Sequence, residues 1–224
     1  MTLVAKAWLS FAALALAMAL LLFLPAGTLR YWQAWVYLAV FFGASSLVTL
    51  HLMKHDPALL ERRLRGGPTA EKEPAERVIT LFTSLGFISL LVVAGLDHRF
   101  GWSSVPVWAV AAGNLLVAVG FYFVFRVYRV NTFASATIEV AEGQRVVSNG
   151  PYALVRHPMY ASASLYLLGT PLSLGSWWGF VGIGAMLPFL IWRVLDEERL
   201  LARDLPGYPE YQRRVRYRLL PHVW

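Results

Sequence analysis

Residues 160–195 read YASASLYLLGTPLSLGSWWGFVGIGAMLPFLIWRVL. This mostly apolar stretch is longer than the ~20 residues that one membrane-spanning helix needs. Gly169-Thr170-Pro171 and Gly175-Ser176 interrupt it, and Gly and Pro together mark a break in a helix. We therefore predict a helical hairpin with a short first arm to about Thr170, a turn near Leu172–Ser176 and a return arm through Leu195.

Four further apolar stretches precede the hairpin, each close to the length of a spanning helix and each free of acidic residues: Ala7–Pro25, Tyr31–Met53, Val78–Leu96 and Val105–Phe125. A signal peptide is the alternative interpretation of the first stretch. Its apolar core of about 18 residues exceeds the usual 7–15, and no clear cleavage site follows. The pattern predicts an all-α, polytopic integral membrane bundle of about six membrane helices, with a C-terminal helical hairpin and a cytoplasmic tail.

The composition supports a membrane protein. Apolar residues make up 58% of the 224 residues and charged residues 15%, against roughly 45–50% and about 25% in soluble domains. The mean hydropathy is +0.53. A soluble globule of this size has too little interior to hide so much apolar surface. Since the chain has no cysteine, disulfides, thiolate nucleophiles, cysteine-bound zinc and iron–sulfur clusters are excluded.

The basic residues are distributed unequally between the two sides that six crossings define. All of the 20 Lys and Arg except Arg30 and Arg99 fall on the side of the two termini. Because cytoplasmic loops carry an excess of Lys and Arg, we predict a multi-pass protein with both termini in the cytoplasm. The net charge is +7, and the basic residues that cause it lie between the apolar runs. This placement indicates membrane lipids as partners and no nucleic acid.

The polar linker ends in Gly150-Pro-Tyr-Ala-Leu-Val-Arg-His-Pro-Met-Tyr160. Pro158 suits the first turn of the following helix, which puts Arg156 and His157 at a helix N-terminus. The positive helix end, Arg156 and the free backbone N–H groups form a site for a carboxylate or phosphate. Interfacial anchoring of Arg and Tyr at the lipid headgroups explains the same residues equally well.

A second constellation, Arg193-Val-Leu-Asp-Glu-Glu-Arg-Leu-Leu201, ends the return arm. Glu197 lies one turn after Arg193, so an i,i+4 ion pair is possible. Glu197 and Glu198 diverge by about 100° on a helix, so one can face the bundle and the other water. An ordinary solvated helix end is the alternative. Both constellations lie on the cytoplasmic side of one hairpin, and together they suit a zwitterionic ligand.

Other motifs carry weaker signals. His51 and His55 have the i,i+4 spacing of a metal pair, but two imidazoles rarely make a site alone, so we predict no metal. Gly113 and Gly120 indicate close helix packing. Asn131-Thr132-Phe133 fits a ligand contact or a turn. The tail from about Pro209 to Arg218 reads as a basic helix, either on the membrane surface or as a lid.

The combination of these motifs resembles the isoprenylcysteine carboxyl methyltransferase family, which forms a wider group with phospholipid N-methyltransferases. The resemblance rests on the order and spacing of motifs from about Asn131 to Trp224: Gly150-Pro-Tyr152, Arg156-His-Pro-x-Tyr160, Glu197-Glu198-x-x-Leu201, Tyr208-x-x-Tyr211 and Leu220-Pro-x-x-Trp224. The family often has Gly two residues after the motif Tyr, where this chain has Ser162.

The resemblance implies an S-adenosylmethionine site open to the cytosol, with a lipophilic acceptor entering from the bilayer. It implies two parts: N-terminal membrane helices in residues 1–125, and a methyltransferase-like region with the cofactor site, hairpin and tail in residues 126–224. Tyr152, Arg156, His157, Pro158 and Tyr160 are expected at the methionine end of the cofactor, and Glu197 and Glu198 at its ribose or amino group.

We therefore expect an S-adenosylmethionine-dependent methyltransferase that resembles isoprenylcysteine carboxyl O-methyltransferases and acts on a lipophilic small-molecule or lipid-linked substrate. Arg156 and Arg193 are the candidate catalytic residues, because either can hold a carboxylate acceptor. A phospholipid N-methyltransferase and a small-thiol S-methyltransferase are the alternatives within the class. An NADPH-dependent membrane reductase and a non-enzymatic membrane scaffold are the alternatives outside it.

Overall fold

The computed structural model describes residues 1–67, 69–71 and 73–224. These residues form helices and no strand. The helices are α1 (Leu3–Ala26), α2 (Trp32–His55), α3 (Pro57–Leu64), α4 (Pro74–Phe100), α5 (Val107–Tyr128), the short 3-10 helix η1 (Gly150–Ala153), α6 (Pro158–Ser173), α7 (Gly179–Asp204) and α8 (Tyr208–Arg214). The predicted all-α class is confirmed. Residues 56–73, between α2 and α4, are called the charged connector below. Pro68 and Lys72 in it lie outside the described residues.

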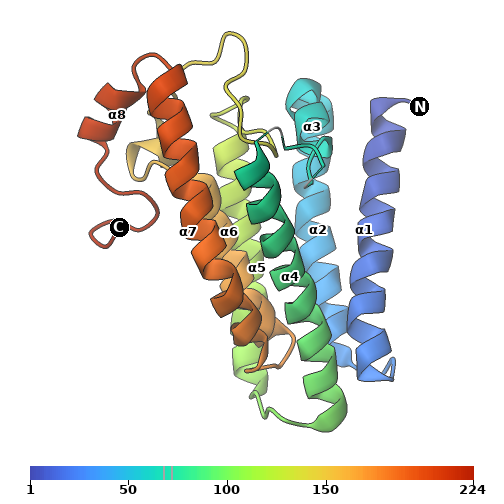
Figure 1. The fold of residues 1–224 in the computed structure, drawn as a ribbon. Coiled ribbons are helices and arrows are strands. Elements are labelled where there is room, and N and C mark those ends of the chain that lie inside the picture. The colour runs from blue at the N-terminus through green and yellow to red at the C-terminus, as the bar shows by residue number, and fades with distance from the viewer. Residues whose placement is uncertain (68, 72) are drawn as a thin grey trace.

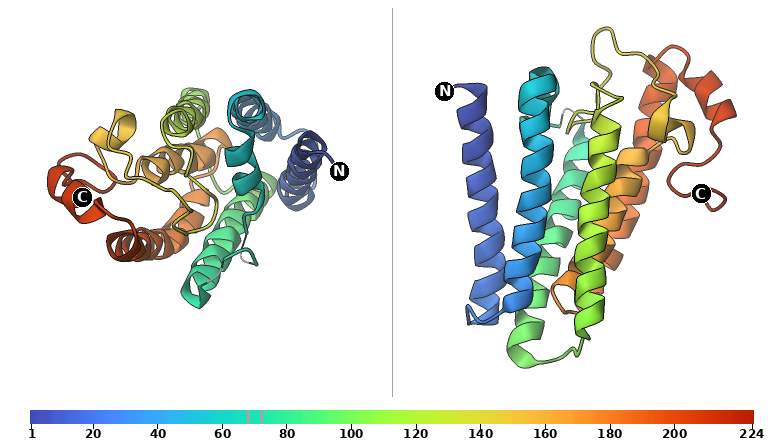
Figure 2. Two further views of the ribbon diagram at one scale, coloured as in Figure 1. Left: turned by 90° about the horizontal axis from the view of Figure 1, so that it is seen from above. Right: turned by 180° about the vertical axis from the view of Figure 1, so that it is seen from behind.

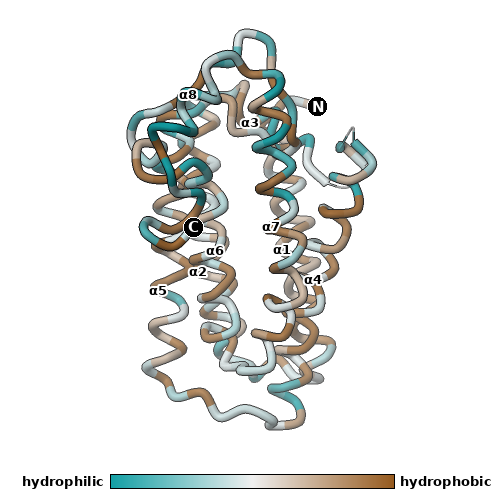
Figure 3. Tube along the Cα trace, turned by 60° about the vertical axis from the view of Figure 1, so that its left-hand side comes forward, coloured by the Kyte–Doolittle hydropathy of each residue, from teal (hydrophilic) through white to brown (hydrophobic). Residues whose placement is uncertain are grey.

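The long helices run roughly parallel and alternate in direction (Figures 1 and 2). The N-terminus, α3 and α8 lie at one end, called the charged end below, together with the linker, residues 129–149 between α5 and η1. Hydrophilic segments gather there in Figure 3, whereas apolar residues follow the helices. In the part of the chain that the structure describes, five helices are long and apolar enough to cross a membrane: α1, α2, α4, α5 and α7.

The predicted hairpin is formed by α6 and α7. Its first arm, α6, has 16 residues, which at 1.5 Å per residue spans about 24 Å, less than the ~30 Å hydrocarbon core. Gly175 ends the arm with a φ of +69°, and Ser176 donates its backbone N–H to the Pro171 carbonyl over 2.9 Å. The turn therefore follows Ser173, close to the predicted place.

Local signals set the helix starts at the charged end. Pro57, Pro74 and Pro158 occupy the first turns of α3, α4 and α6, where the missing N–H costs no hydrogen bond. The Asp56 side chain caps α3 by accepting from the Leu59 backbone N–H over 2.9 Å. The tail differs from expectation: α8 ends at Arg214, and residues 215–224 are not helical. The Tyr217 and Arg218 carbonyls instead accept the backbone N–H groups of Arg156 and His157 at the start of α6.

Small residues bring the helices together. A Cβ at Gly113 in α5 would lie 2.5 Å from the Ser173 backbone nitrogen, and one at Gly120 would lie 2.8 Å from the Tyr166 backbone nitrogen. Both glycines thus put the backbone of α5 directly against that of α6. Gly182 in α7 packs in the same way on Leu90 of α4, where a Cβ would meet the Leu90 side chain at 3.0 Å. The predicted role of Gly113 and Gly120 in close packing is confirmed.

Candidate active site

A cavity of about 640 Å³ lies between α4, α6, α7 and the linker. Toward the charged end its wall is polar; this polar compartment is lined by Asn131, Gln144, Tyr152, Arg156, Glu197 and Tyr208. Deeper between the helices its wall is apolar; this apolar compartment is lined by Phe41, Phe87, Ile88, Leu167, Met186 and Leu190. Tyr160 and Arg193 lie between the two compartments. On α7, Arg193 stands between Leu190 of the apolar compartment and Glu197 of the polar one. Tyr160 on α6 likewise stands between Arg156, just before that helix, and Leu167.

The Arg156 guanidinium has two N–H groups, both on Nη2, that no described residue accepts. Its Nε donates to Glu198 Oε1 over 2.6 Å, and its Nη1 donates to the carbonyls of Val215 and Arg216 over 2.8 Å each. No described residue accepts from its Nη2, although Arg156 lines the cavity. A guanidinium has five donors in a fixed plane, so Arg156 is held by the protein on one side and open to a ligand on the other.

Glu198 is buried behind that wall. Its carboxylate accepts from Arg156 and Arg218 over 2.6 and 2.9 Å and lies 3.2 Å from His157 Nε2. The backbone N–H groups of Arg156 and His157 donate to the Tyr217 and Arg218 carbonyls over 2.9 Å each. The tail is thereby fixed to the start of α6. Glu198, His157 and Pro158 do not line the cavity.

Three tyrosines form an aromatic wall of the polar compartment. The Tyr211 hydroxyl donates to the Tyr152 carbonyl over 2.7 Å, and Asn131 Nδ2 donates to the Tyr152 hydroxyl over 2.6 Å. Burial raises the pKa of Tyr152, Tyr208 and Tyr211, so all three stay protonated. The Tyr208 hydroxyl is buried without a hydrogen-bond partner among the described residues. Since a buried hydroxyl normally has one, this orphan indicates a place for a ligand or a water molecule.

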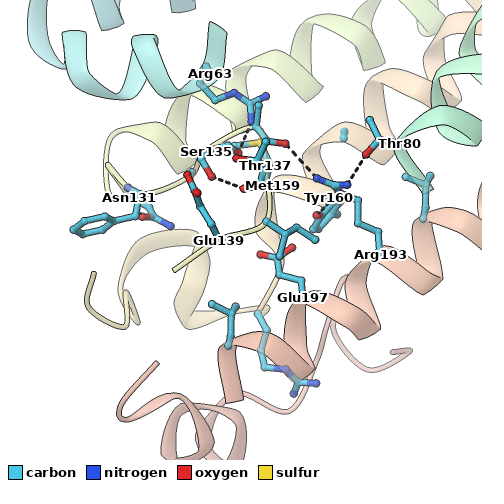
Figure 4. A pocket seen from close by; sticks show the side chains of 18 of the residues that line it. Arg63, Thr80, Asn131, Ser135, Thr137, Glu139, Met159, Tyr160, Arg193 and Glu197 are labelled. Atoms are coloured by element: carbon cyan, nitrogen blue, oxygen red, sulfur yellow. Dashed lines mark hydrogen bonds between the residues drawn. The ribbon is translucent and has the colours of Figure 1, made fainter. Parts of the chain in front are cut away.

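Arg193 has no donor left for a substrate. Its Nε donates to the Tyr160 hydroxyl over 3.1 Å. Its Nη1 donates to Glu76 and Thr80 over 2.6 and 2.8 Å, and its Nη2 to Glu71 and the Ala136 carbonyl over 2.8 and 3.2 Å. All five donors of the guanidinium are therefore used within the protein. Figure 4 shows Arg193 beside Tyr160, with its hydrogen bond to Thr80.

Glu197 lies on the cavity side of α7, one position before the buried Glu198. Its side chain is 26% exposed and lies 3.9 Å from His157 Nδ1, and it also approaches the Tyr160 hydroxyl. The predicted i,i+4 pair with Arg193 does not form, because Arg193 is occupied by Glu71 and Glu76 from other parts of the chain. Glu197 is therefore the carboxylate of the pair that a ligand can reach.

The predicted site residues thus divide into two groups. Tyr152, Arg156, Tyr160, Arg193 and Glu197 line the cavity, whereas His157, Pro158 and Glu198 support it from behind. Residues that sequence reasoning did not assign to the site include Glu71, Glu76, Thr80, Tyr208 and most of the linker. The motif Tyr208-x-x-Tyr211 was a visible signal, and so was Glu76, an acid next to an apolar run.

The His51–His55 pair lies outside this cavity. The two imidazoles stack with ring centroids 4.3 Å apart, and the His55 ring bonds to the His51 carbonyl. Among the described residues, no group of three or more His, Cys, Asp or Glu side chains has the arrangement of a metal site.

Comparison with known proteins gives one family. No curated protein compared with the chain matches it. Residues 108–205, from the start of α5 to the residue after α7, match the model of the phospholipid methyltransferase family. The match covers both arms of the hairpin and the lining residues Tyr152, Arg156, Tyr160, Arg193 and Glu197. Through this segment, which is less than half of the chain, the protein is similar to the phospholipid methyltransferase family.

Proposed function

We propose that the protein transfers a methyl group from S-adenosylmethionine to a lipophilic, membrane-borne acceptor, in the manner of isoprenylcysteine carboxyl O-methyltransferases. The single observation that carries this proposal is the two-part cavity. A polar compartment at the charged end suits a water-soluble cofactor, and an apolar compartment between the helices suits a hydrocarbon tail. The family match supports the methyl-transfer chemistry, and the positive-inside rule supports a cytoplasmic charged end.

The residues of the polar compartment fit this cofactor. Its methionine end carries a carboxylate and an ammonium group, which match the unused Arg156 Nη2 and the Glu197 carboxylate. The orphaned Tyr208 hydroxyl offers a hydrogen bond to a ribose or base. His157, Pro158 and Glu198, which resemblance also assigned to the cofactor, act in this proposal by holding Arg156 and the tail in place.

When bound, S-adenosylmethionine supplies an electrophilic methyl group on a sulfonium sulfur. The protein's own residues align the acceptor and exclude water, which are the main sources of catalysis for such a displacement. Arg156 binds and orients charge at the polar end. Tyr160 separates the two compartments, and Arg193 fixes its ring by donating to its oxygen. Arg193 thus acts through Tyr160 and does not itself grip the acceptor.

An amine acceptor is the second candidate, as in a phospholipid N-methyltransferase. Two observations favour it: Arg193 has no donor left for a carboxylate, and Glu197 gives the cavity an acid that attracts an ammonium group. Methylation of an ammonium or of a neutral thiol releases one proton per methyl group, whereas methylation of a carboxylate releases none. Methyl transfer measured separately with a farnesylated cysteine, phosphatidylethanolamine and a lipophilic thiol therefore identifies the acceptor, and proton release distinguishes the carboxylate from the other two.

The cofactor is tested by thermal stabilisation of the purified protein in detergent. We expect S-adenosylhomocysteine at ~100 times its dissociation constant to add about 2.7 kcal/mol, and NADPH to add nothing. Glu197→Gln should weaken this shift, and Glu210→Gln serves as the control, because Glu210 is an exposed acid of α8 that does not line the cavity. Stabilisation by NADPH alone would indicate a reductase, and stabilisation by neither ligand in a folded sample would indicate a scaffold.

A further inference from the structure

The linker, residues 129–149, forms much of the polar compartment's wall but has no regular secondary structure. It is held instead by side chains from the N-terminal half. Arg62 donates to the Thr132 carbonyl, and Arg63 donates to the Ser135 carbonyl over 2.8 Å. Both arginines belong to α3. The charged connector between α2 and α4, which the family match does not include, therefore holds the wall of the cavity.

Glu71 makes the deepest of these attachments. Glu71 is only 2% exposed, and its Oε2 accepts a hydrogen bond from the Ile138 backbone N–H over 3.3 Å. Its Oε1 accepts from Arg193 Nη2 over 2.8 Å, and the same nitrogen donates to the Ala136 carbonyl over 3.2 Å. One ion pair thus binds the linker twice, through an amide at Ile138 and a carbonyl at Ala136.

The same ion pair reaches the middle of the cavity. Arg193 Nε donates to the Tyr160 hydroxyl over 3.1 Å, and Tyr160 lies between the two compartments. The orientation of Tyr160 and the position of the linker therefore depend on one guanidinium. These simultaneous hydrogen bonds require the planar guanidinium of arginine with its five N–H donors. The ammonium group of a lysine cannot make them all.

We propose that Glu71 and Arg193 are positioning residues. Their ion pair, called the latch below, holds the linker against the polar compartment and fixes Tyr160 between the two compartments. The effect on catalysis rests on the proposed function, but the latch itself does not. With the latch broken, a smaller fraction of molecules has a complete cofactor site. The apparent dissociation constant of the cofactor rises in inverse proportion to that fraction.

Hydrogen–deuterium exchange of the linker in the detergent-solubilised protein tests the latch without any ligand. Loss of one charge-assisted interaction should increase the exchange rate of peptides from residues 131–141 by about tenfold or more in Glu71→Gln and in Arg193→Lys. Peptides from residues 208–218 should not change. Glu61→Gln is the matched control, because Glu61 is an exposed acid on α3 that pairs with Arg65.

Ile138→Pro provides a second variant in case the buried substitutions prevent folding, because it removes the N–H that Glu71 accepts and leaves Glu71 and Arg193 in place. It also replaces a side chain that lines the cavity and fixes the backbone φ. Unchanged exchange of the linker in folded Glu71→Gln, or in Ile138→Pro, would refute the latch. In the same variants S-adenosylhomocysteine should bind about tenfold more weakly. Wild-type protein that binds no S-adenosylhomocysteine would refute the proposed function and leave the exchange result standing.

Discussion

At the scale of single residues, Tyr208 separates ligand binding from stability. Its buried hydroxyl has no partner among the described residues, so Tyr208→Phe should leave the melting temperature unchanged or slightly raised. If that hydroxyl bonds the cofactor, binding of S-adenosylhomocysteine should weaken by about 2- to 10-fold, the value of one hydrogen bond. Tyr211→Phe is the contrast: it removes a bond to the Tyr152 carbonyl and should lower the melting temperature. Equal binding by Tyr208→Phe and wild type contradicts the assignment.

Glu198 is a structural acid by the same kind of argument. Its buried carboxylate holds Arg156 and Arg218. Removing one partner of a buried ion pair typically costs about 3–5 kcal/mol, and we expect Glu198→Ala to lose stability of that order in chemical unfolding. Asp204→Ala is the control, because its partner Arg203 is 72% exposed and solvent-exposed ion pairs contribute little to stability. A small and equal effect of both substitutions would mean that Glu198 does not fix the tail.

At the scale of the elements, the contact between α5 and α6 depends on glycine. A methyl group at Gly113 would lie 2.5 Å from the Ser173 backbone nitrogen, whereas nothing lies within 4 Å of one at Gly184 in α7. Gly113→Ala should therefore destabilise the fold by about 1–3 kcal/mol through overpacking. Gly184→Ala should be neutral or stabilising by up to about 1 kcal/mol through helix propensity. Unfolding of both variants in detergent checks the difference, which disappears if the two helices separate easily.

At the scale of the whole molecule, the charged end is expected in the cytoplasm. The chain has no cysteine, so single cysteines report sidedness directly. Leu29→Cys lies in the α1–α2 loop and Glu142→Cys in the linker, and both positions are exposed. A membrane-impermeant maleimide added outside intact cells should label Leu29→Cys and not Glu142→Cys. The reverse pattern would place both termini outside.

The local properties of the sequence determined much of this molecule. Apolar runs of spanning length predicted α1, α2, α4 and α5, and each predicted end lies within four residues of the observed helix end. Gly and Pro predicted the turn between α6 and α7, and Pro158 the start of α6. The Gly and Pro signals act on the backbone within one or two helical turns. The distribution of basic residues depends on the interaction of the loops with the membrane. None requires knowledge of which segments touch.

The partners of the charged side chains were decided only by the tertiary structure. Arg193 was expected to pair with Glu197 one turn away, yet it pairs with Glu71 and Glu76, which are 122 and 117 positions distant in the chain. Glu198 likewise finds Arg156 across 42 positions. A buried charge costs too much free energy to remain unpaired, so it takes whichever partner the packed helices bring within reach. That choice depends on how α4, α6, α7 and the linker meet, which local spacing along the chain does not encode.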